Sequence, residues 1–311
     1  MDVEIRPWRP GDEAAILGLF RAVFGREMSP AYWRWRFHDH PAGGPLVMLA
    51  WAGETLAAHY AASRATLAIE GEAVPAALSM TTMTHPGWRG RGLLEATARA
   101  LYAALAAEGC AATLGFPNQM VHAARLTKLG WIDVCDVATM TADLTRPPVA
   151  DPAVIAADAI DARFDRLATR LARDTPVGFA RDAATLAWRI DANPAQRYTR
   201  LLLPEGGGIA GYALLKPFGA EAMDLVELRA ADAAATRALL AAAQARAAAA
   251  GARRLHCWRL PGEPDRALFE RAGFAAGAPV TYFGGCALAR PVALINDPRR
   301  WRLAMLDSDL Y

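Results

Sequence analysis

The sequence predicts an α/β (α+β) protein that contains two copies of one structural unit. The first observation is the pattern of residues 3–144, in which strand-like alternation, short turns and amphipathic helical segments follow one another. The second is a repeat: WRFHDHP at residues 35–41 returns as WRIDANP at residues 188–194, a shift of 188 − 35 = 153. A repeat of this kind indicates a duplicated unit of about 140 residues.

Other matched segments follow in the same order and support the duplication. HYA at residues 59–61 matches GYA at 211–213, and LTKLGW at 126–131 matches FERAGF at 269–274. A proline-rich break begins at residue 145. The tail is expected either to be disordered or to fold back over the first domain. We predict a first domain over residues 1–145, a linker over 146–160, a second domain over 161–290 and a C-terminal tail over 291–311.

Within the first copy, the predicted elements are joined by short connections. Asp12 is expected to cap the first helix, and Ser29 and Pro30 begin the second. Two hairpins follow, around turns at 52–54 and 70–72. The predicted strands are residues 3–6, 46–51, 56–62, 65–69, 74–84, 111–116 and 132–144. The predicted helices are residues 13–24, 30–37 and 93–108, and a short one after Asn118 that ends at Leu129.

Length and composition limit the class of protein. The chain has 311 residues, of which 54% are hydrophobic, and a net charge of +2. Such a chain can bury a sizeable core, and its balanced charge argues against a nucleic-acid partner. It has no leader-like start and no apolar run of ~18 residues, so we expect no membrane partner. Its dispersed cysteines indicate a reduced, cytoplasmic protein without a metal site: Cys110, Cys135, Cys257 and Cys286.

The most informative stretch is residues 80–108, in which an extended segment, a loop with three glycines and a helix follow one another. In this loop, Gly90 and Gly92 allow the backbone to approach a ligand closely. The first N–H groups of the following helix lack partners of their own, and the helix dipole favours negative charge there. Arg89 and Arg91 add positive charge. The stretch therefore predicts a binding site for a phosphate-bearing ligand.

The spacing of the glycines distinguishes between kinds of phosphate site. A P-loop would carry Lys and then Ser or Thr after its last glycine, but Leu93 and Leu94 stand there. A dinucleotide-binding unit would need a third glycine, which is missing. The order Arg89, Gly92, Leu94 instead resembles the Arg/Gln-x-x-Gly-x-Gly/Ala motif of the GNAT superfamily of N-acetyltransferases, from which Leu94 departs. A solvated basic loop between a strand and a helix is the structural alternative.

This resemblance implies a fold and a cosubstrate. The fold would be two tandem GNAT domains, each a mixed, mostly antiparallel sheet flanked by helices. The cosubstrate would be acetyl-CoA, with no metal. Its pantetheine arm would run beside the backbone of Met83, Thr84 and His85, and Asn118 would contact its amides, cap a helix, or do both. Its diphosphate would lie on Arg89, Gly90, Arg91, Gly92 and Leu93.

The second copy differs at this loop. Residues 230–235 read AADAAA, so the segment lacks glycine and carries the carboxylate of Asp232. A carboxylate repels a diphosphate at close range. We therefore expect that the second copy does not bind the cosubstrate and has a structural or acceptor-shaping role.

Proton transfer has the weakest support in the sequence. GNAT enzymes often place a tyrosine acid four residues before the closing glycine, where this chain has Leu126. His122 and Tyr60 are the substitutes, and His59 is a candidate base. Catalysis by positioning alone is the other interpretation. Further base candidates are His38, Asp39 and His40, or a water held by Ser79 and Thr81.

The predicted function is transfer of acetyl from acetyl-CoA to the primary amine of a small molecule, by direct attack in a ternary complex. An aromatic–arginine block at residues 32–37, with DSD at 307–309, resembles GNAT proteins encoded with surface-polysaccharide genes and suggests an amino sugar. Because Trp35-Arg36 recurs at Trp188-Arg189, these residues also fit a structural role. The alternatives are a non-catalytic acyl-CoA sensor or scaffold, and transfer of a longer acyl chain. A homodimer is a further expectation that the sequence leaves open.

Overall fold

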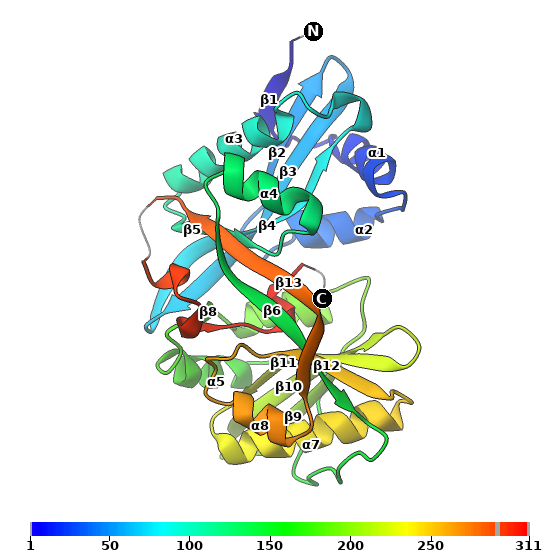
Figure 1. Cartoon of the computed structure of the whole chain (residues 1–311), viewed down its shortest axis with the longest axis vertical. Coiled ribbons are helices and arrows are strands. Elements are labelled where there is room, and N and C mark those ends of the chain that lie inside the picture. Colours follow the sequence, from blue (N-terminus) through cyan, green and yellow to red (C-terminus); the bar gives the residue numbers. More distant parts are fainter. Residues whose placement is uncertain (1, 290–292, 310–311) are drawn as a thin grey trace. The chain divides into compact units, whose positions relative to one another are not determined.

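The computed structural model describes residues 2–289 and 293–309, which form two compact units (Figure 1). Unit 1 consists of Met1–Thr66, Val74–Val134 and Phe283–Ala293. Unit 2 consists of Leu67–Ala73, Cys135–Tyr282 and Leu294–Tyr311. Unit 1 thus includes residues 283–293 from the second half of the sequence, and unit 2 includes residues 67–73 from the first half.

Unit 1 is organised around a mixed sheet with the strand order β1-β2-β3-β4-β5-β13. The pairs β1–β2, β2–β3 and β5–β13 are antiparallel, whereas β4 and β5 run parallel. The strands are β1 (Glu4–Pro7), β2 (Leu46–Ala52), β3 (Thr55–Ile69), β4 (Glu72–Thr84), β5 (Ala112–Gly115) and the end of β13 (Ala275–Ala287). The helical elements are α1 (Glu13–Phe24), α2 (Pro30–Trp33), η1 (Arg34–His38), η2 (Pro86–Trp88), α3 (Leu93–Ala107) and α4 (Gln119–Lys128).

Unit 2 repeats this plan with the strand order β6-β12-β11-β10-β9-β7. All of these neighbours pair antiparallel except β11 and β12, which are parallel. The strands are β6 (Ile132–Asp143), β7 (Ile155–Ala156), β8 (Val177–Phe179), β9 (Thr199–Glu205), β10 (Gly208–Phe218), β11 (Ala222–Ala230), β12 (Arg254–Trp258) and β14 (Trp301–Arg302). The helical elements are α5 (Arg163–Ala172), α6 (Ala183–Leu186), η3 (Ala187–Asp191), α7 (Ala233–Ala249), α8 (Arg266–Arg271), η4 (Ala293–Asn296), η5 (Pro298–Arg300) and η6 (Met305–Asp307). The predicted fold class, a mixed and mostly antiparallel sheet with flanking helices, is confirmed.

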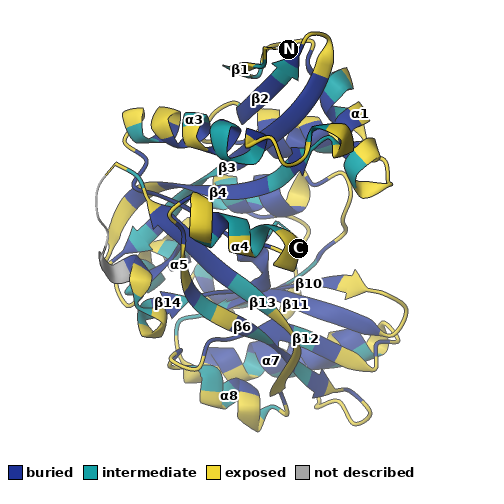
Figure 2. Cartoon of the chain, turned by 45° about the horizontal axis from the view of Figure 1, so that its top comes forward, coloured by how far each residue is buried: buried dark blue, intermediate teal, exposed yellow. Residues whose placement is uncertain are grey.

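Each unit has an apolar core between its sheet and its long helix. In unit 1, Leu101 and Leu105 of α3 are buried in one cluster with Tyr60 and Ala77 of the sheet. In unit 2, α7 contributes residues such as Leu239 to a larger cluster. Strands β2 and β3 are buried along most of their length, while exposed residues lie on the outer turns of the helices (Figure 2). Among the residues that the structure describes, no helix is both long and apolar enough to span a membrane.

The duplication read from the sequence reappears as a shared local structure. The elements η1 and η3 are both π-helical turns of five residues, and they begin 187 − 34 = 153 residues apart. Each turn buries a tryptophan and the arginine that follows it. The buried pair is Trp35 and Arg36 in unit 1, and Trp188 and Arg189 in unit 2. Because both copies bury this pair, we infer that it serves mainly to fill the core.

The last strand of each copy pairs with a strand of the other copy. Residues 139–143 of β6 pair with residues 254–258 of β12 inside unit 2. Residues 284–287 of β13 pair with residues 112–115 of β5 inside unit 1. Two glycines let this part of β13 lie close to the backbones on either side, Gly284 beside β6 and Gly285 beside β5. A Cβ atom on Gly284 would lie 2.4 Å from the carbonyl oxygen of Ile132, and one on Gly285 would lie 2.4 Å from that of Thr113.

Two local predictions are wrong. Residues 56–62 and 65–69 were expected to form two strands, but both belong to the continuous strand β3. Asp12 precedes α1 as predicted, yet its carboxylate caps no helical N–H group. It accepts hydrogen bonds from the Arg6 guanidinium, at 2.7 and 2.8 Å, and from the Arg9 N–H, at 2.7 Å. A charged partner within reach outcompetes the neutral amides of the helix, since charge-assisted hydrogen bonds are stronger.

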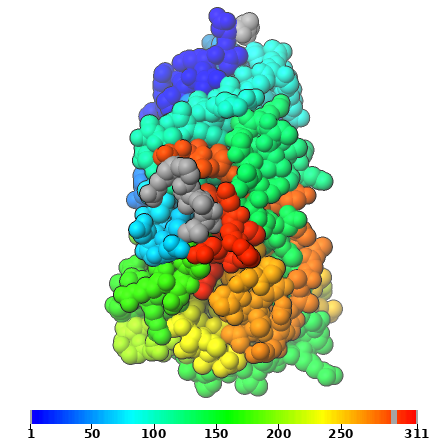
Figure 3. All heavy atoms as spheres, turned by 60° about the vertical axis from the view of Figure 1, so that its left-hand side comes forward, coloured from blue at the N-terminus to red at the C-terminus, as the bar shows by residue number. Residues whose placement is uncertain are grey.

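The described part of the C-terminal tail is ordered and belongs to unit 2, contrary to the expectation of disorder. Trp301 and Leu303 are each 1% exposed, and β14 pairs with β8. A Cβ atom on Gly262 would lie 3.1 Å from the carbonyl oxygen of Arg299, so the tail passes closely over the segment after β12. Figure 3 shows this segment of the tail, in red, beside the orange residues of unit 2.

We predict that Gly284→Ala destabilises the protein, because the added Cβ atom has no space beside the Ile132 backbone. Overpacking of this kind costs about 1–3 kcal/mol. The matched control is Gly277→Ala, since Gly277 lies in the same strand and a Cβ atom added there would have nothing within 4 Å. Urea unfolding should show a lower free energy of unfolding for the first variant only. Equal values for the two variants would contradict the close approach of β13 to the Ile132 backbone.

Candidate functional site

The strands β4 and β5 separate after a short parallel pairing. Only residues 76–78 of β4 pair with residues 112–114 of β5, although β4 continues to Thr84. Beyond this point the backbone of β4 is bent at Thr81, whose φ of +49° is unusual for a β-branched residue. The two diverging strands therefore leave a wedge-shaped opening at their carboxyl ends.

The side chain of His59 is hydrogen-bonded to the backbone at this bend. Its Nδ1 atom lies 2.8 Å from the carbonyl oxygen of Thr81, so Nδ1 carries the proton and donates. The imidazole is 0% exposed and meets the edge of the Phe37 ring, at 6.1 Å between centroids. Burial lowers the pKa of His59 to about 4, so the ring is neutral near pH 7. This placement suits a residue that fixes the backbone; it does not bring His59 to a ligand as a base.

The loop before α3 has the geometry of an anion cradle. Gly90 and Gly92 have φ values of +74° and +75°, a conformation that suits glycine. Gly92 is the N-cap of α3, and no side chain accepts a hydrogen bond from the first turn of this helix. Its first N–H groups are therefore available to a ligand, and the positive end of the helix dipole lies at the same place.

The corresponding helix of unit 2 has lost this property. The Asp232 carboxylate caps α7 and accepts a hydrogen bond from the Ala235 N–H at 2.8 Å. A first-turn N–H group that is available to a ligand in α3 is thus already hydrogen-bonded to a side chain in α7. The carboxylate also places negative charge where a phosphate would need to lie.

A cavity of about 360 Å³ adjoins the start of α3. Several predicted cofactor-binding residues line it, namely Thr84, Arg89, Gly90, Gly92, Leu93 and Asn118. Asn118 also caps α4, because its Oδ1 atom accepts from the Met120 and Val121 N–H groups. Three predicted residues lie beside the cavity without lining it. Met83 is buried, His85 accepts from the Gly87 N–H, and Arg91 lies 4.5 Å from the centroid of the Trp88 ring.

Sequence reasoning missed part of the lining. The end of α1 contributes an aromatic ring, Phe24, that is 42% exposed, and α4 contributes Lys128. Lys128 and Arg89 are positive, whereas the one acidic residue of the lining, Glu95, is paired with Arg99 at 2.9 Å. The cavity therefore favours an anionic ligand. The other missed residues are Val23, Thr82, Trp88, Leu94, Glu95, Met120 and Val121.

The two proposed acids lie in different surroundings. Tyr60 is 0% exposed, and its hydroxyl group lies 2.6 Å from that of Tyr102 and accepts from Ser79 at 2.9 Å. His122 lies on α4, where its Nε2 atom is 2.6 Å from Asp133 of β6. Neither residue lines the cavity. The structure thus brings the loop, Asn118 and the end of β4 together, but it leaves the candidate acids outside this group.

The other candidate bases also lie away from the cavity lining. His38 and Asp39 form an exposed pair at 2.8 Å, and His40 accepts from the Ala42 N–H. Ser79 donates to Tyr60, and Thr81 carries the bend of β4. Within residues 2–289 and 293–309, no group of three or more His, Cys, Asp or Glu side chains is arranged to hold a metal ion.

In unit 2 the equivalent opening is filled by the chain. Strands β11 and β12 also pair over three residues and then separate. Beyond the pairing, the Arg259 Nη2 atom donates to the carbonyl oxygen of Leu228 at 2.6 Å. The tail adds Leu303, whose N–H donates to Glu263 at 3.3 Å. The remaining cavity is about 40 Å³, compared with about 360 Å³ in unit 1.

Comparison with known proteins gives a family match for the N-terminal part of the chain. Residues 4–132 match the family model described as an acetyltransferase (GNAT) domain. No curated protein matches the chain by sequence. The match covers strands β1 to β5, the glycine loop and the helices α3 and α4 of unit 1, and it includes every described residue that lines the larger cavity.

Solved structures share the fold over most of the chain. A conserved protein from Enterococcus faecalis V583, described as a probable N-acyltransferase, has a TM-score of 0.74 at 14% identity, over 93% of this chain and 73% of its own. A GCN5-related N-acetyltransferase from Kribbella flavida has a TM-score of 0.69 at 18% identity, with coverages of 91% and 70%. Eis1 from Mycobacterium abscessus has a TM-score of 0.61 at 17% identity, with coverages of 91% and 73%. At such identities the likeness establishes a common fold.

These findings define an acyltransferase fold with an anion cradle in unit 1. Residues 4–132 thus match an acetyltransferase domain of the GNAT superfamily, and most of the chain shares its fold with structures described as N-acyltransferases or N-acetyltransferases. The superfamily uses acetyl-CoA as its cosubstrate, so the fold supports acyl-CoA-dependent acetyl transfer in general.

We predict that His59→Gln reduces the acid sensitivity of the protein. A folded-state pKa of about 4, below the ordinary histidine value of 6.5, means that the unfolded chain binds the proton first as the pH falls. His59 should therefore lower the stability between about pH 6.5 and pH 4, by on the order of 3 kcal/mol in total. Glutamine keeps an N–H donor for Thr81 but does not titrate.

The measurement is urea unfolding of the wild type and the variant at pH 7.5, 6 and 5. The matched control is His38→Gln, which removes an exposed imidazole of the same unit. A pH dependence that is the same in wild type and His59→Gln would show that His59 is not held neutral in the fold.

Proposed function

We propose that the protein is an N-acetyltransferase that moves acetyl from acetyl-CoA to a primary amine of a small molecule. The observation that carries this proposal is the uncapped start of α3, which opens onto a positively charged cavity beside separated parallel strands. An amino sugar is the acceptor class that the aromatic–arginine block suggests. The four free cysteines fit a cytoplasmic protein.

Different residues of unit 1 would bind the diphosphate and the extended arm of the cosubstrate. The N–H groups of the first turn of α3, with Arg89 and Lys128, would hold the diphosphate. The part of β4 from Ser79 to Thr84 has no pairing with β5, so its backbone can bond to the amides of an extended arm. Thr82 and Thr84 line the cavity on this strand. The thioester would then lie in the opening between the strands.

The chemistry requires few groups beyond this alignment. The amine nitrogen attacks the thioester carbon, the carbon–sulfur bond breaks, and the proton of the nitrogen passes to the sulfur directly or through water. Among the residues that the structure describes, no His, Tyr or Cys is part of the cavity lining. Holding two reactants in line contributes strongly to such a reaction, so we propose catalysis mainly by positioning. His122, paired with Asp133, is the remaining candidate for proton transfer.

We further propose that unit 2 does not bind acetyl-CoA. Its helix start is capped by Asp232, and Arg259 and Glu263 occupy the space between its separated strands together with the tail. The second copy would then support unit 1 or shape its acceptor.

The second candidate function is a non-catalytic acyl-CoA sensor or scaffold, and one observation favours it. Two of the three proposed catalytic residues, Tyr60 and His59, are fully buried and serve the fold. A sensor needs the cradle but no proton-transfer group. The two functions differ in turnover, not in binding.

We predict that acetyl-CoA binds with one site per chain and that Arg89→Ala weakens the binding at least tenfold. A hydrogen bond to a charged group contributes about 1.5–3 kcal/mol, and 1.4 kcal/mol is a factor of ten. Isothermal titration calorimetry measures the stoichiometry and the affinity. The control is Arg237→Ala, an exposed arginine of α7 in unit 2.

A second pair of variants isolates charge at the helix start. Both Asp and Asn tolerate the positive φ of Gly92, and the two side chains have nearly the same shape. Gly92→Asp should therefore bind acetyl-CoA more weakly than Gly92→Asn. Two sites per chain, or equal affinity of these two variants, would overturn the assignment of the diphosphate to this loop.

We predict that the protein releases coenzyme A thiol from acetyl-CoA when a suitable primary amine is present. The test is a thiol-release assay across amino sugars and simple amines, with a parallel series of longer acyl-CoA thioesters. His122→Ala should lower the rate if His122 transfers the proton, and should leave it unchanged if positioning suffices. Tight binding of acetyl-CoA without turnover of any amine would favour the sensor over the enzyme.

A further inference from the structure

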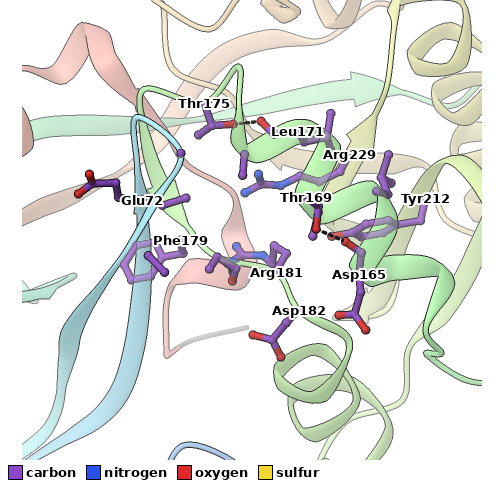
Figure 4. A pocket seen from close by; sticks show the side chains of 17 residues that line it. Glu72, Asp165, Thr169, Leu171, Thr175, Phe179, Arg181, Asp182, Tyr212 and Arg229 are labelled. Atoms are coloured by element: carbon purple, nitrogen blue, oxygen red, sulfur yellow. Dashed lines mark hydrogen bonds between the residues drawn. The ribbon is translucent and has the colours of Figure 1, made fainter.

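A second cavity lies entirely within unit 2 and has no part in the proposed reaction. Its volume is about 210 Å³, and it is enclosed by α5, the segment from β8 to α6, and the strands β10 and β11 (Figure 4). Residues 71–73, which unit 2 also contains, form its rim. The cavity is smaller than the roughly 300–1,000 Å³ of sites for drug-sized ligands, so its ligand would have few atoms.

Most of the wall is apolar. Helix α5 turns Leu167 and Leu171 toward the cavity, with two alanines between and after them, and Phe179 of β8 closes another side. These side chains can cover a hydrocarbon body but cannot bind a charged one. The apolar wall therefore selects a ligand with an apolar part of at least a few carbon atoms.

The inner end of the cavity carries an unsatisfied hydroxyl group. Tyr212 of β10 is 2% exposed and lines the cavity, and its Oη atom has no hydrogen-bond partner among the described residues. Buried polar groups in native proteins are nearly always paired, so an orphan hydroxyl that faces a cavity indicates a ligand or a water. Burial raises the pKa of Tyr212 above its ordinary value, so the group keeps its proton and can donate.

Arg229 of β11 provides free donors at the same end. Its Nε atom donates to Glu227 at 3.0 Å, and none of the described residues accepts a hydrogen bond from its Nη atoms. The neighbouring Arg181 differs, because it is bound by two buried carboxylates, Glu227 at 2.5 Å and Asp307. Figure 4 shows both guanidinium groups reaching into the cavity from different elements. Arg181 is therefore neutralised by its own carboxylates, whereas both Nη atoms of Arg229 lack an acceptor among the described residues.

Of the three acidic residues in the lining, Glu72 is exposed at the rim, and the other two are already engaged. The Asp165 Oδ1 atom accepts from the Ala183 N–H at 2.7 Å, and Asp182 accepts from the N–H and the hydroxyl group of Thr185. Both carboxylates therefore fix the start of α6. The groups of the cavity that remain open to a ligand near its inner end are donors, and donors recognise an acceptor.

We propose that this cavity binds a small monocarboxylate with an apolar body. The carboxylate oxygens would accept hydrogen bonds from the Arg229 Nη atoms and the Tyr212 hydroxyl group, and the hydrocarbon part would lie against α5 and Phe179. One open guanidinium and one neutral donor match one carboxylate, whereas a phosphate would need more donors. This site is independent of the acetyl-CoA site and stands whether or not the proposed function holds.

The probes are pentanoate and benzoate, with pentylamine and benzylamine as charge-reversed counterparts of the same shape. We expect the two carboxylates to bind the full chain in calorimetry and to raise its melting temperature, and we expect the amines to do neither. Tyr212→Phe is the decisive variant. Because the hydroxyl group has no partner among the described residues, this variant should keep the wild-type melting temperature without ligand, yet bind the carboxylates about tenfold more weakly.

The matched control is Tyr198→Phe, which alters a buried tyrosine of unit 2 that does not line the cavity, and it should bind as the wild type does. Arg229→Gln, with its folding checked by circular dichroism, should abolish binding. The proposal is overturned if neither carboxylate binds, if the amines bind as well as the carboxylates, or if Tyr212→Phe binds the carboxylates with wild-type affinity.

Discussion

The early separation of two parallel strands is the constraint on which the rest of unit 1 depends. After residues 78 and 114, β4 and β5 no longer share hydrogen bonds, and the polar backbone of β4 on this side must find other partners. The bend at Thr81 and its bond to the neutral ring of His59 keep the strand in this position. An extended ligand with amide groups would complete the hydrogen bonds that β5 no longer supplies. At the opening, the β4 backbone thus lacks a neighbouring strand on the side of β5.

The same separation of strands leaves an open cavity in one copy and a filled space in the other. In unit 1 the space remains a cavity, and the adjacent helix begins with a glycine that leaves its amides free. In unit 2 the chain supplies its own partners, through the Arg259 guanidinium, the tail and the Asp232 cap. Few residues account for this difference, because the strand separation is common to both. A duplicated unit can therefore lose a ligand without losing its fold.

The features that sequence reasoning predicted are those with a local physical cause. Gly90 and Gly92 form the predicted loop before α3 with the positive φ that their residue type favours, and Asn118 caps the helix that it precedes. The repeat of Trp35 and Trp188 indicated a shared buried turn, because the same packing was required twice. Each of these features is decided within a few residues along the chain.

The features that it missed depend on distant parts of the chain. Asp12 bonds to Arg6 instead of the helix because a competing charge lies within reach. The pairing of β13 with β5 joins residues about 170 positions apart, and only the glycines at 284 and 285 hint at it. The orphan hydroxyl group of Tyr212 is invisible in sequence, where it resembles its counterpart Tyr60. The difference is that Tyr60 has partners on α3 and β4, whereas Tyr212 faces a cavity.

The partners of Tyr60 support the proposal that unit 1 acts mainly by positioning its ligands. Its hydroxyl group, that of Tyr102 and that of Ser79 form a chain of short hydrogen bonds, to which the Trp131 N–H donates at 2.7 Å. Arg125 extends this chain by donating to Ser79, and its guanidinium lies 4.3 Å from the centroid of the Trp131 ring. The network therefore joins β3, β4, α3 and α4 at the level where the strands separate. A buried network of this kind is rigid only while every member is present, since each lost bond leaves a buried polar group unpaired. Polar side chains that could have transferred protons are thus fixed as supports, and a precisely shaped opening is what they would provide to the proposed reaction.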